Sequence, residues 1–208
     1  MSDTYLRRYT DIPALIYLLN ERQITLLDPQ SWDDSNDSHY LALYQEKKKL
    51  ESVLALCFTQ ASETYHHWRV FANGSSGVCI RFKRPELLRA VKKQPGLRTR
   101  TVTYLTLEEI RDKKLAIRDL PFLKRWAFEN ENELRMIYES KAENISKLDI
   151  AIPLSCIHRI TLSPWVHPAL SPHIKRMLRS IEGCGALEIV RSTLIGNMEW
   201  KNLGESAA

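Results

Sequence analysis

Short apolar runs separated by helical patterns are the feature that most restricts the fold of this chain. Runs such as "QITLL", "VLALCFT", "LDIAIPL" and "LEIVRSTL" have the length of strands. Before the first of them, Asp11 can cap a helix that has Pro13 in its first turn. Further amphipathic stretches predict helices at residues 39–50, 85–92, 106–118 and 172–181. Because the strands and helices alternate with no repeat and no Pro- or Ser-rich linker, we expect one α+β domain over residues 1–208, with a mixed or antiparallel sheet and flanking helices.

Composition agrees with a packed domain, since 44% of the 208 residues are hydrophobic and 26% are charged. The four cysteines are isolated from one another and form no CxxC pair, so we expect reduced core residues and no metal site. The longest apolar run, "ALIYLL", is too short to cross a bilayer. The sequence therefore predicts a cytoplasmic protein with no membrane partner.

Positive charge is concentrated between residues 81 and 100, although the whole chain carries a formal net charge of only +5. Such a segment can attract the phosphates of a nucleic acid, and it can equally be the solvated face of a helix. The candidate nucleic-acid-binding residues are Lys83, Arg84, Arg89, Lys92 and Lys93.

The stretch "RWAFENENELRMIY" places charged residues at every second position. In a strand, side chains alternate between faces, so Glu131, Glu133 and Arg135 would share one face, and Leu134 and Met136 would share the other. In a helix the same charges would form an ordinary wet surface. The apolar alternation favours a strand that carries all three charged residues, preceded by a turn or helix end that contains Glu129.

An ordered set of motifs resembles a bacterial family called domain of unknown function 2971. The set comprises "RYTDIPALIYLL" with "ITLLDPQSWDDSND", then "LCFTQASETYHHWRVFANGSSGVCIRF", then "FLKRWAFENENELRMIY". The last resembles the family's most specific motif, which falls on Lys124, Arg125, Phe128, Glu131, Glu133 and Arg135. The resemblance runs from about residue 8 to residue 194, and it leaves residues 195–208 as a C-terminal tail. No activity is established for the family as a class, and its members look like components of mobile elements and phage-defence neighbourhoods.

The layout is similar to folds that transfer ADP-ribose from NAD, and this likeness implies a nucleotide-dependent transferase acting in phage defence or as a toxin. In such folds a first strand carries a basic or aromatic residue, a second carries a hydroxyl, and a late strand carries an essential glutamate. The residues implied as catalytic are Glu131, Glu133 and Arg135, and those implied to bind NAD are Arg8, Tyr9, Thr59 and Trp68. A carboxylate suits this chemistry, because loss of nicotinamide develops positive charge on the ribose.

Two alternatives remain open. In a metal-dependent nuclease, Asp33, Asp34 and Asp37 would join the two glutamates around magnesium, since hard cations prefer clustered carboxylates. In a module that only binds nucleic acid or a partner protein, Glu131, Glu133 and Arg135 would form a structural network.

The motif "YHHWRVF" contains two adjacent histidines, His66 and His67. On a helix they point about 100° apart and cannot chelate a metal together, so we expect both at the surface or at a helix end. Trp68, which follows them, is expected to fill the core under that helix unless it stacks on a ligand.

Overall fold

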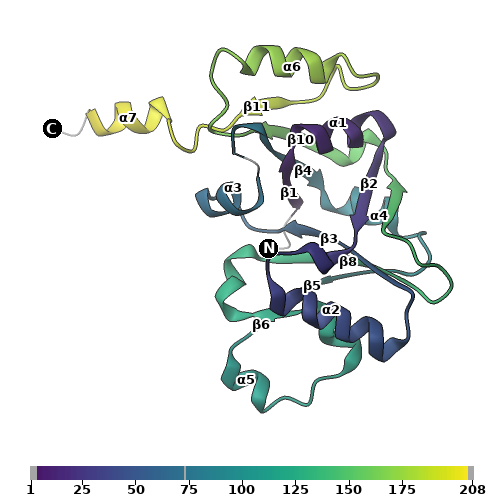
Figure 1. Ribbon diagram of the computed structural model, residues 1–208. Coiled ribbons are helices and arrows are strands. Elements are labelled where there is room, and N and C mark those ends of the chain that lie inside the picture. The colour runs from purple at the N-terminus through teal and green to yellow at the C-terminus, as the bar shows by residue number, and fades with distance from the viewer. Residues whose placement is uncertain (1–3, 73, 206–208) are drawn as a thin grey trace.

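The computed structural model describes residues 4–72 and 74–205, apart from the side chain of Ser31, and it confirms the α+β class (Figure 1). The strands are β1 (Tyr5–Asp11), β2 (Gln23–Leu27), β3 (Ser52–Thr59), β4 (Gly77–Lys83), β5 (Leu97–Thr101), β6 (Thr103–Leu105), β7 (Leu123–Arg125), β8 (Glu133–Ser140), β9 (Lys147–Ala151), β10 (Ile157–Leu162) and β11 (Ile189–Arg191).

The α-helices are α1 (Ile12–Glu21), α2 (Ser35–Lys48), α3 (Tyr65–Phe71), α4 (Arg84–Val91), α5 (Leu107–Arg111), α6 (Ser171–Arg179) and α7 (Met198–Glu205). Short 3-10 helices are η1 (Pro29–Ser31), η2 (Gly74–Ser76), η3 (Ile117–Phe122), η4 (Trp126–Glu131) and η5 (Leu154–Cys156). No helix in residues 4–72 and 74–205 is long and apolar enough to cross a membrane.

Most of these strands form one mixed sheet in the order β11-β10-β4-β1-β3-β2-β9. Strand β3 pairs along its other edge with β8, antiparallel, from Ser52 to Thr59. Strand β8 pairs in turn with β5. The backbone pairing between β1 and β3 is confined, in the described residues, to Arg7 opposite Thr59. The two halves of the sheet therefore meet near one residue pair.

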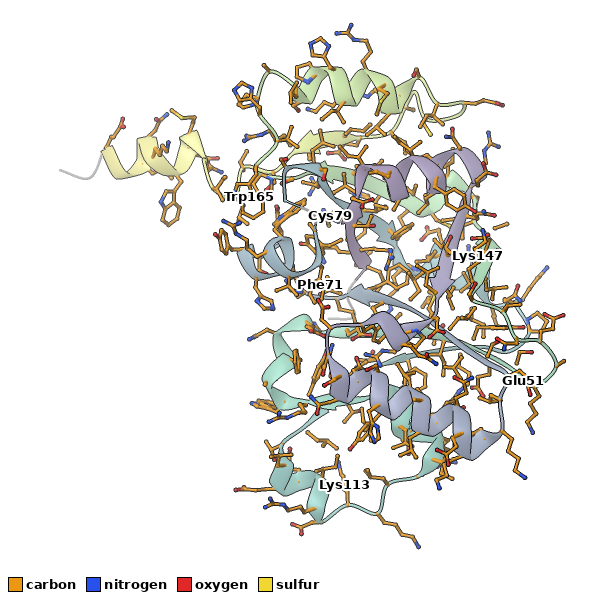
Figure 2. All side chains as sticks on the ribbon, in the orientation of Figure 1. Glu51, Phe71, Cys79, Lys113, Lys147 and Trp165 are labelled. Atoms are coloured by element: carbon orange, nitrogen blue, oxygen red, sulfur yellow. The ribbon has the colours of Figure 1, made fainter. Side chains whose placement is uncertain are left out.

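Helices cover both faces of the sheet. The largest core cluster packs α1, α4 and α6 on one face, through residues such as Leu19, Leu87 and Leu178. On the opposite face, a second cluster packs α2 against β3 and β8, and a third packs α3 against Tyr9 and Cys79. Trp165 also packs against the third cluster. Figure 2 shows Cys79 and Trp165 close to α3.

Two predicted helix boundaries are wrong. Helix α2 begins at Ser35 and not near residue 39, because the Asp34 carboxylate accepts hydrogen bonds from the backbone N–H groups of Asn36 at 3.1 Å and Asp37 at 3.4 Å. Helix α5 ends at Arg111, well before residue 118. The segment expected only as a C-terminal tail contains α7, which projects away from the body of the protein (Figure 1).

Candidate functional site

Charged side chains from three parts of the chain form a buried group between α2 and β8, which we call the ion cluster. Its members are Asp37, Lys124, Glu131, Glu133 and Arg135. Their side chains are between 0% and 9% exposed. Burial of this many charges is tolerated only when each one is paired, so the contacts within the cluster decide what each residue can do.

Arg135, on β8, is the centre of the ion cluster. Asp37 accepts two hydrogen bonds from its guanidinium, each at 2.6 Å. Glu133 accepts two more, from Nε at 2.6 Å and from Nη2 at 3.0 Å, and the carbonyl of Pro121 accepts one from Nη1 at 3.0 Å. Since a guanidinium has five N–H groups, all of them are used inside the protein. Arg135 therefore holds two carboxylates in place and has no donor left for a ligand.

Lys124, on β7, joins the third carboxylate to the cluster. Its Nζ lies 2.6 Å from Glu131 Oε2, 3.5 Å from Asp37 and 3.8 Å from Glu133. The ring of Phe128 covers the ammonium group, with its centroid 4.9 Å away. Lys124 is thus the link between Glu131 and the Arg135 network.

Glu131 does not lie on the strand, which corrects the sequence prediction. It is the last residue of η4, and Asn132 then adopts a left-handed conformation with φ 43° before β8 begins at Glu133. The predicted alternation holds from Glu133 onward, and Glu129 lies in η4 as expected. The turn at Asn132 separates the two glutamates, so that Glu133 belongs to the sheet and Glu131 to its rim.

The two glutamates differ in their free oxygens. Both oxygens of Glu133 accept hydrogen bonds from Arg135. Glu131 accepts one from Lys124 through Oε2, whereas its Oε1 has no hydrogen-bond partner in the described part of the chain. Glu131 Oε1 is also not completely buried. One carboxylate oxygen at this site is therefore unpaired in the described residues and not completely buried.

Charge balance explains why the pKa values of the two glutamates move in opposite directions. The cluster contains three carboxylates and two cations. Burial raises the pKa of Glu131, and the nearby charge of Lys124 offsets only part of that effect. Burial alone would also raise the pKa of Glu133, but Arg135 outweighs it, with help from Lys124, and the net direction is downward.

Thr59, one of the residues expected to bind NAD, contacts the segment of Glu131 directly. Its hydroxyl donates a hydrogen bond of 2.6 Å to the Glu131 carbonyl and accepts one of 3.0 Å from the Ala61 backbone. In the sheet, Thr59 stands opposite Arg7 on one side and Glu133 on the other. The structure therefore brings a hydroxyl of the second predicted strand to the base of the predicted carboxylate.

His67 lies in the first turn of α3, at a helix end, which is one of the two expected positions, but it is buried, 1% exposed, and not at the surface. Its Nδ1 is 2.5 Å from the Thr64 hydroxyl, and its ring stacks on Tyr9 with 5.4 Å between centroids. Burial lowers the pKa of His67, more than the nearby carbonyl of Glu131 raises it. His67 Nε2 and the Tyr9 hydroxyl have no hydrogen-bond partner in the described residues. The packing of α3 on β1 thus leaves two unpaired polar atoms on this face of the sheet.

The other residues expected to bind NAD lie further from the ion cluster. Trp68 is fully buried, and its Nε1 donates to Glu63 at 2.7 Å, so neither of its ring faces is open to a ligand. Arg8 donates to the carbonyl of Cys57 at 3.4 Å, and burial lowers its pKa. By strand alternation, Arg8 and Tyr9 point to opposite faces of the sheet.

The predicted basic segment is divided by the fold. Arg89, Lys92 and Lys93 are exposed at the end of α4, and Lys83 is half-buried at the end of β4. Arg84 donates to the Gln60 side chain at 2.7 Å, at the start of the loop that leads to α3. The segment is therefore a surface strip with one residue directed toward the Thr59 region.

The acidic residues of the nuclease alternative are not arranged around a metal site. Asp34 caps α2, Asp33 is exposed, and Asp37 binds Arg135. No group of three or more histidine, cysteine or carboxylate side chains suited to a metal occurs in residues 4–72 and 74–205. The positive partners of the buried carboxylates are Lys124 and Arg135.

A surface hollow of about 420 Å³ opens next to the ion cluster. It lies between the N-terminus of α2, the start of α5 and β7, and its lining includes Tyr40, Leu107 and Arg125. Asp37 and Lys124 also line it. Glu131, Thr59 and Arg8 do not line it, so the hollow borders the cluster through Asp37 and Lys124.

Residues 67–136 match the family model described as Protein of unknown function (DUF2971). The match extends from α3 through β7 and η4 to the start of β8, and so includes four of the five cluster residues. It confirms the expected family resemblance over this segment. The comparison with curated proteins gave no match.

Solved structures similar to this chain include three of DarT from Thermus sp. 2.9. In complex with ADP-ribosylated ssDNA, DarT is 9% identical, and the alignment covers 92% of this chain and 95% of that one, with a TM-score of 0.47. The complex with NAD+ is 10% identical, with coverage of 92% and 96% and a TM-score of 0.47. The complex with carba-NAD+ is 10% identical, with coverage of 92% and 97% and a TM-score of 0.45.

Proposed function

We propose that the protein is an enzyme that transfers the ADP-ribosyl group of NAD to an acceptor, and that Glu131 is its catalytic carboxylate. The observation that carries this proposal is the state of Glu131. It is a nearly buried carboxylate whose Oε2 is held by Lys124 at 2.6 Å and whose Oε1 is unbonded in the described residues. The pKa of this carboxyl is raised by burial, as is common for groups that act in catalysis.

The chemistry requires a fixed negative charge beside the ribose. The bond between the nicotinamide nitrogen and ribose C1′ breaks, and nicotinamide leaves with the electron pair. Positive charge then develops on the ribose, and the ionised Glu131 would stabilise it through Oε1. A nitrogen or oxygen of the acceptor bonds to C1′ and loses its proton. A carboxylate that is already held in position avoids the cost of reorganisation during this step.

The rest of the ion cluster supports a positioning role. Every N–H group of Arg135 is hydrogen-bonded to Asp37, Glu133 or a backbone carbonyl. Arg135 therefore acts on Glu131 only through the shape and charge of the cluster. Thr59 fixes the backbone of Glu131. We therefore assign Glu133 and Arg135, two of the three residues expected to be catalytic, to positioning.

The hollow between α2 and α5 supports a nucleotide site on the Lys124 side of the cluster. Its volume is about 420 Å³, within the range of small-molecule sites. Among the residues expected to bind NAD, Thr59 keeps a role in the proposal through its hydrogen bond to the Glu131 backbone, whereas Tyr9 does not line the hollow. The family resemblance supports a biological role in phage defence or as a toxin.

The test is release of nicotinamide from NAD by the purified full chain, measured by chromatography with and without candidate nucleic-acid and protein acceptors. Replacement Glu131→Gln keeps the size of the side chain but removes its charge. We expect the rate to fall by about 100-fold or more, as for loss of a preorganised electrostatic group. The matched control is Glu129→Gln, an exposed residue of the same short helix, η4.

The control variant should release nicotinamide at the wild-type rate. Equal rates for wild type and Glu131→Gln would refute the assignment of Glu131. Absence of nicotinamide release from the wild type with every acceptor would refute the transferase itself. Similar melting temperatures for the wild type and the two variants would establish that a loss of activity does not result from unfolding.

A further inference from the structure

One line of residues crosses the sheet at right angles to its strands. The register places Arg159 of β10 opposite Arg81 of β4, and Arg81 opposite Arg7 of β1. Arg7 stands opposite Thr59 of β3, which stands opposite Glu133 of β8. Directly opposed residues in antiparallel pairs share one face of the sheet. The line therefore joins three neighbouring arginines to the ion cluster on the same face.

We call Arg7, Arg81 and Arg159 the arginine row. Like charges directly opposite each other destabilise a sheet, so three in succession are unfavourable unless an anion lies among them. Nearby acids do not provide one. The ion pair recorded for the row is Arg159 with Glu188, at a long 3.7 Å and with both side chains partly exposed. In the described residues, no carboxylate lies within 4 Å of Arg7 or Arg81.

The polar atoms of the row are only partly satisfied. Nε of Arg81 and Nε of Arg159 are buried and have no hydrogen-bond partner in the described residues. The Nδ1 atom of the adjacent His158 is in the same state. By contrast, Arg7 donates to the carbonyl of Ala61 at 2.7 Å. Burial lowers the pKa of Arg81, and the charges of Arg7 and Arg159 lower it further. A bound anion would pair these donors and would reduce the repulsion between the arginines.

An aromatic side chain fixes the middle of the row. The guanidinium of Arg81 lies over the ring of Tyr5, 3.9 Å from its centroid. The ring of His158 packs against the same tyrosine at 4.5 Å between centroids. These contacts fix the position of the Arg81 guanidinium, and its two NH2 groups are not constrained further by hydrogen bonds in the described residues.

We infer that the arginine row binds the phosphate backbone of a single-stranded nucleic acid. Neighbouring strands are about 4.8 Å apart, so the row extends about 10 Å from β1 to β10. That length suits successive phosphates of a strand better than the compact diphosphate of one nucleotide. Arginine favours phosphate because its donors match two oxygens at once.

The row also has a direction. Its β1 end adjoins Thr59, whose hydroxyl is bonded to the carbonyl of Glu131. A single-stranded nucleic acid bound along the row would lead toward the unpaired oxygen of that carboxylate. This last point rests on the proposed transferase and would make the strand its acceptor, whereas binding by the row does not depend on catalysis.

The test uses fluorescein-labelled single strands of about 12 nucleotides, one of DNA and one of RNA, and the full chain. Fluorescence anisotropy gives the dissociation constant between 50 and 200 mM salt, a design range of about fourfold in ionic strength. For the double variant Arg81→Gln/Arg159→Gln we expect binding at least about tenfold weaker. The slope of log K against log salt should fall by about 1.4, since each phosphate contact on a single strand contributes about 0.7.

Two further proteins make the result specific. Lys47→Gln/Lys48→Gln removes the same charge from the exposed end of α2 and should bind like the wild type. Arg81→Lys/Arg159→Lys keeps the charge and should keep most of the salt slope, which guards against a folding defect. Whether DNA or RNA binds more tightly identifies the sugar, and either one supports the inference.

Three outcomes overturn it. They are no binding by the wild type, equal binding by the wild type and the glutamine variant, and equal weakening by the glutamine variant and the control Lys47→Gln/Lys48→Gln. If equal binding is accompanied by a raised KM for NAD, the row is assigned to the nucleotide. If strand binding behaves as expected while no protein releases nicotinamide, the inference stands and the proposed transferase fails.

Discussion

The two charged regions on this face of the sheet have opposite designs. In the ion cluster, Arg135 satisfies all five of its N–H groups with protein partners and is completely buried. In the arginine row, Arg81 has a buried, unpaired Nε and faces arginines on both sides. Both arginines occupy sheet positions only a few strands apart.

The difference teaches how to separate a charge that shapes the protein from a charge that binds something else. A buried arginine with complete carboxylate pairing is part of the architecture, and removing it leaves its partners uncompensated. A partly exposed arginine among like charges contributes little to the fold. The variants that follow test this contrast, from the largest expected effect to the smallest.

The largest effect is expected for Arg135→Met. The change leaves Asp37 and Glu133 buried without their main partner, and we expect a loss of about 3–5 kcal/mol in the free energy of unfolding. Urea denaturation followed by circular dichroism measures it. If the charges rather than the shape are responsible, the triple variant Asp37→Asn/Glu133→Gln/Arg135→Met should recover at least half of the loss. A single variant as stable as the wild type would contradict the assigned role of the ion cluster.

An intermediate effect is expected for Lys124→Met, seen in the pH profile of nicotinamide release. Glu131 must be ionised to act, so activity should rise with pH through its pKa, which lies above the ordinary 4.5. Lys124 lowers that pKa, and its removal should move the acid limb of kcat/KM upward by about one pH unit or more.

Lys141→Met is the matched control, because Lys141 is an exposed lysine that does not line the hollow. Its acid limb should coincide with that of the wild type. An unchanged limb for Lys124→Met would mean that Glu131 is not the group that titrates.

The smallest effect is expected for the stability of Arg81→Gln. Relief of repulsion from Arg7 and Arg159 opposes loss of the contact with Tyr5, so the free energy of unfolding should change by less than about 1 kcal/mol. Salt screens the repulsion between the arginines. The free energy of unfolding of the variant should therefore rise relative to that of the wild type at low ionic strength. A loss comparable to that of Arg135→Met would show that the row is structural.

Much of the fold could be predicted from local patterns. The apolar run "VLALCFT" became β3, and Asp11 caps α1 through the N–H of Ala14 as its spacing indicated. The start of α2 was missed, because Asp34 caps it from within a segment whose composition is that of a turn. Local chemistry of this kind is ambiguous without the rest of the structure.

The candidate site was only partly predictable, for physical reasons. The motif of Glu131, Glu133 and Arg135 was evident, but their alternation hid the left-handed turn at Asn132 that takes Glu131 off the strand. Asparagine tolerates this conformation better than most residues, which was the one available signal. The pairing of Asp37 with Arg135 and the alignment of the arginine row join distant parts of the chain. They depend on sheet register, which no short pattern in a single sequence determines.

The line of opposed residues from Arg159 to Glu133 also makes this face of the sheet electrically polar. Three arginines stand toward the β10 end, whereas the ion cluster at the β8 end contains three carboxylates and two cations. A flexible anion that diffuses toward the face will be turned by this gradient before it makes any contact. Salt should therefore slow the encounter more than it speeds the departure, so that orientation is settled during approach.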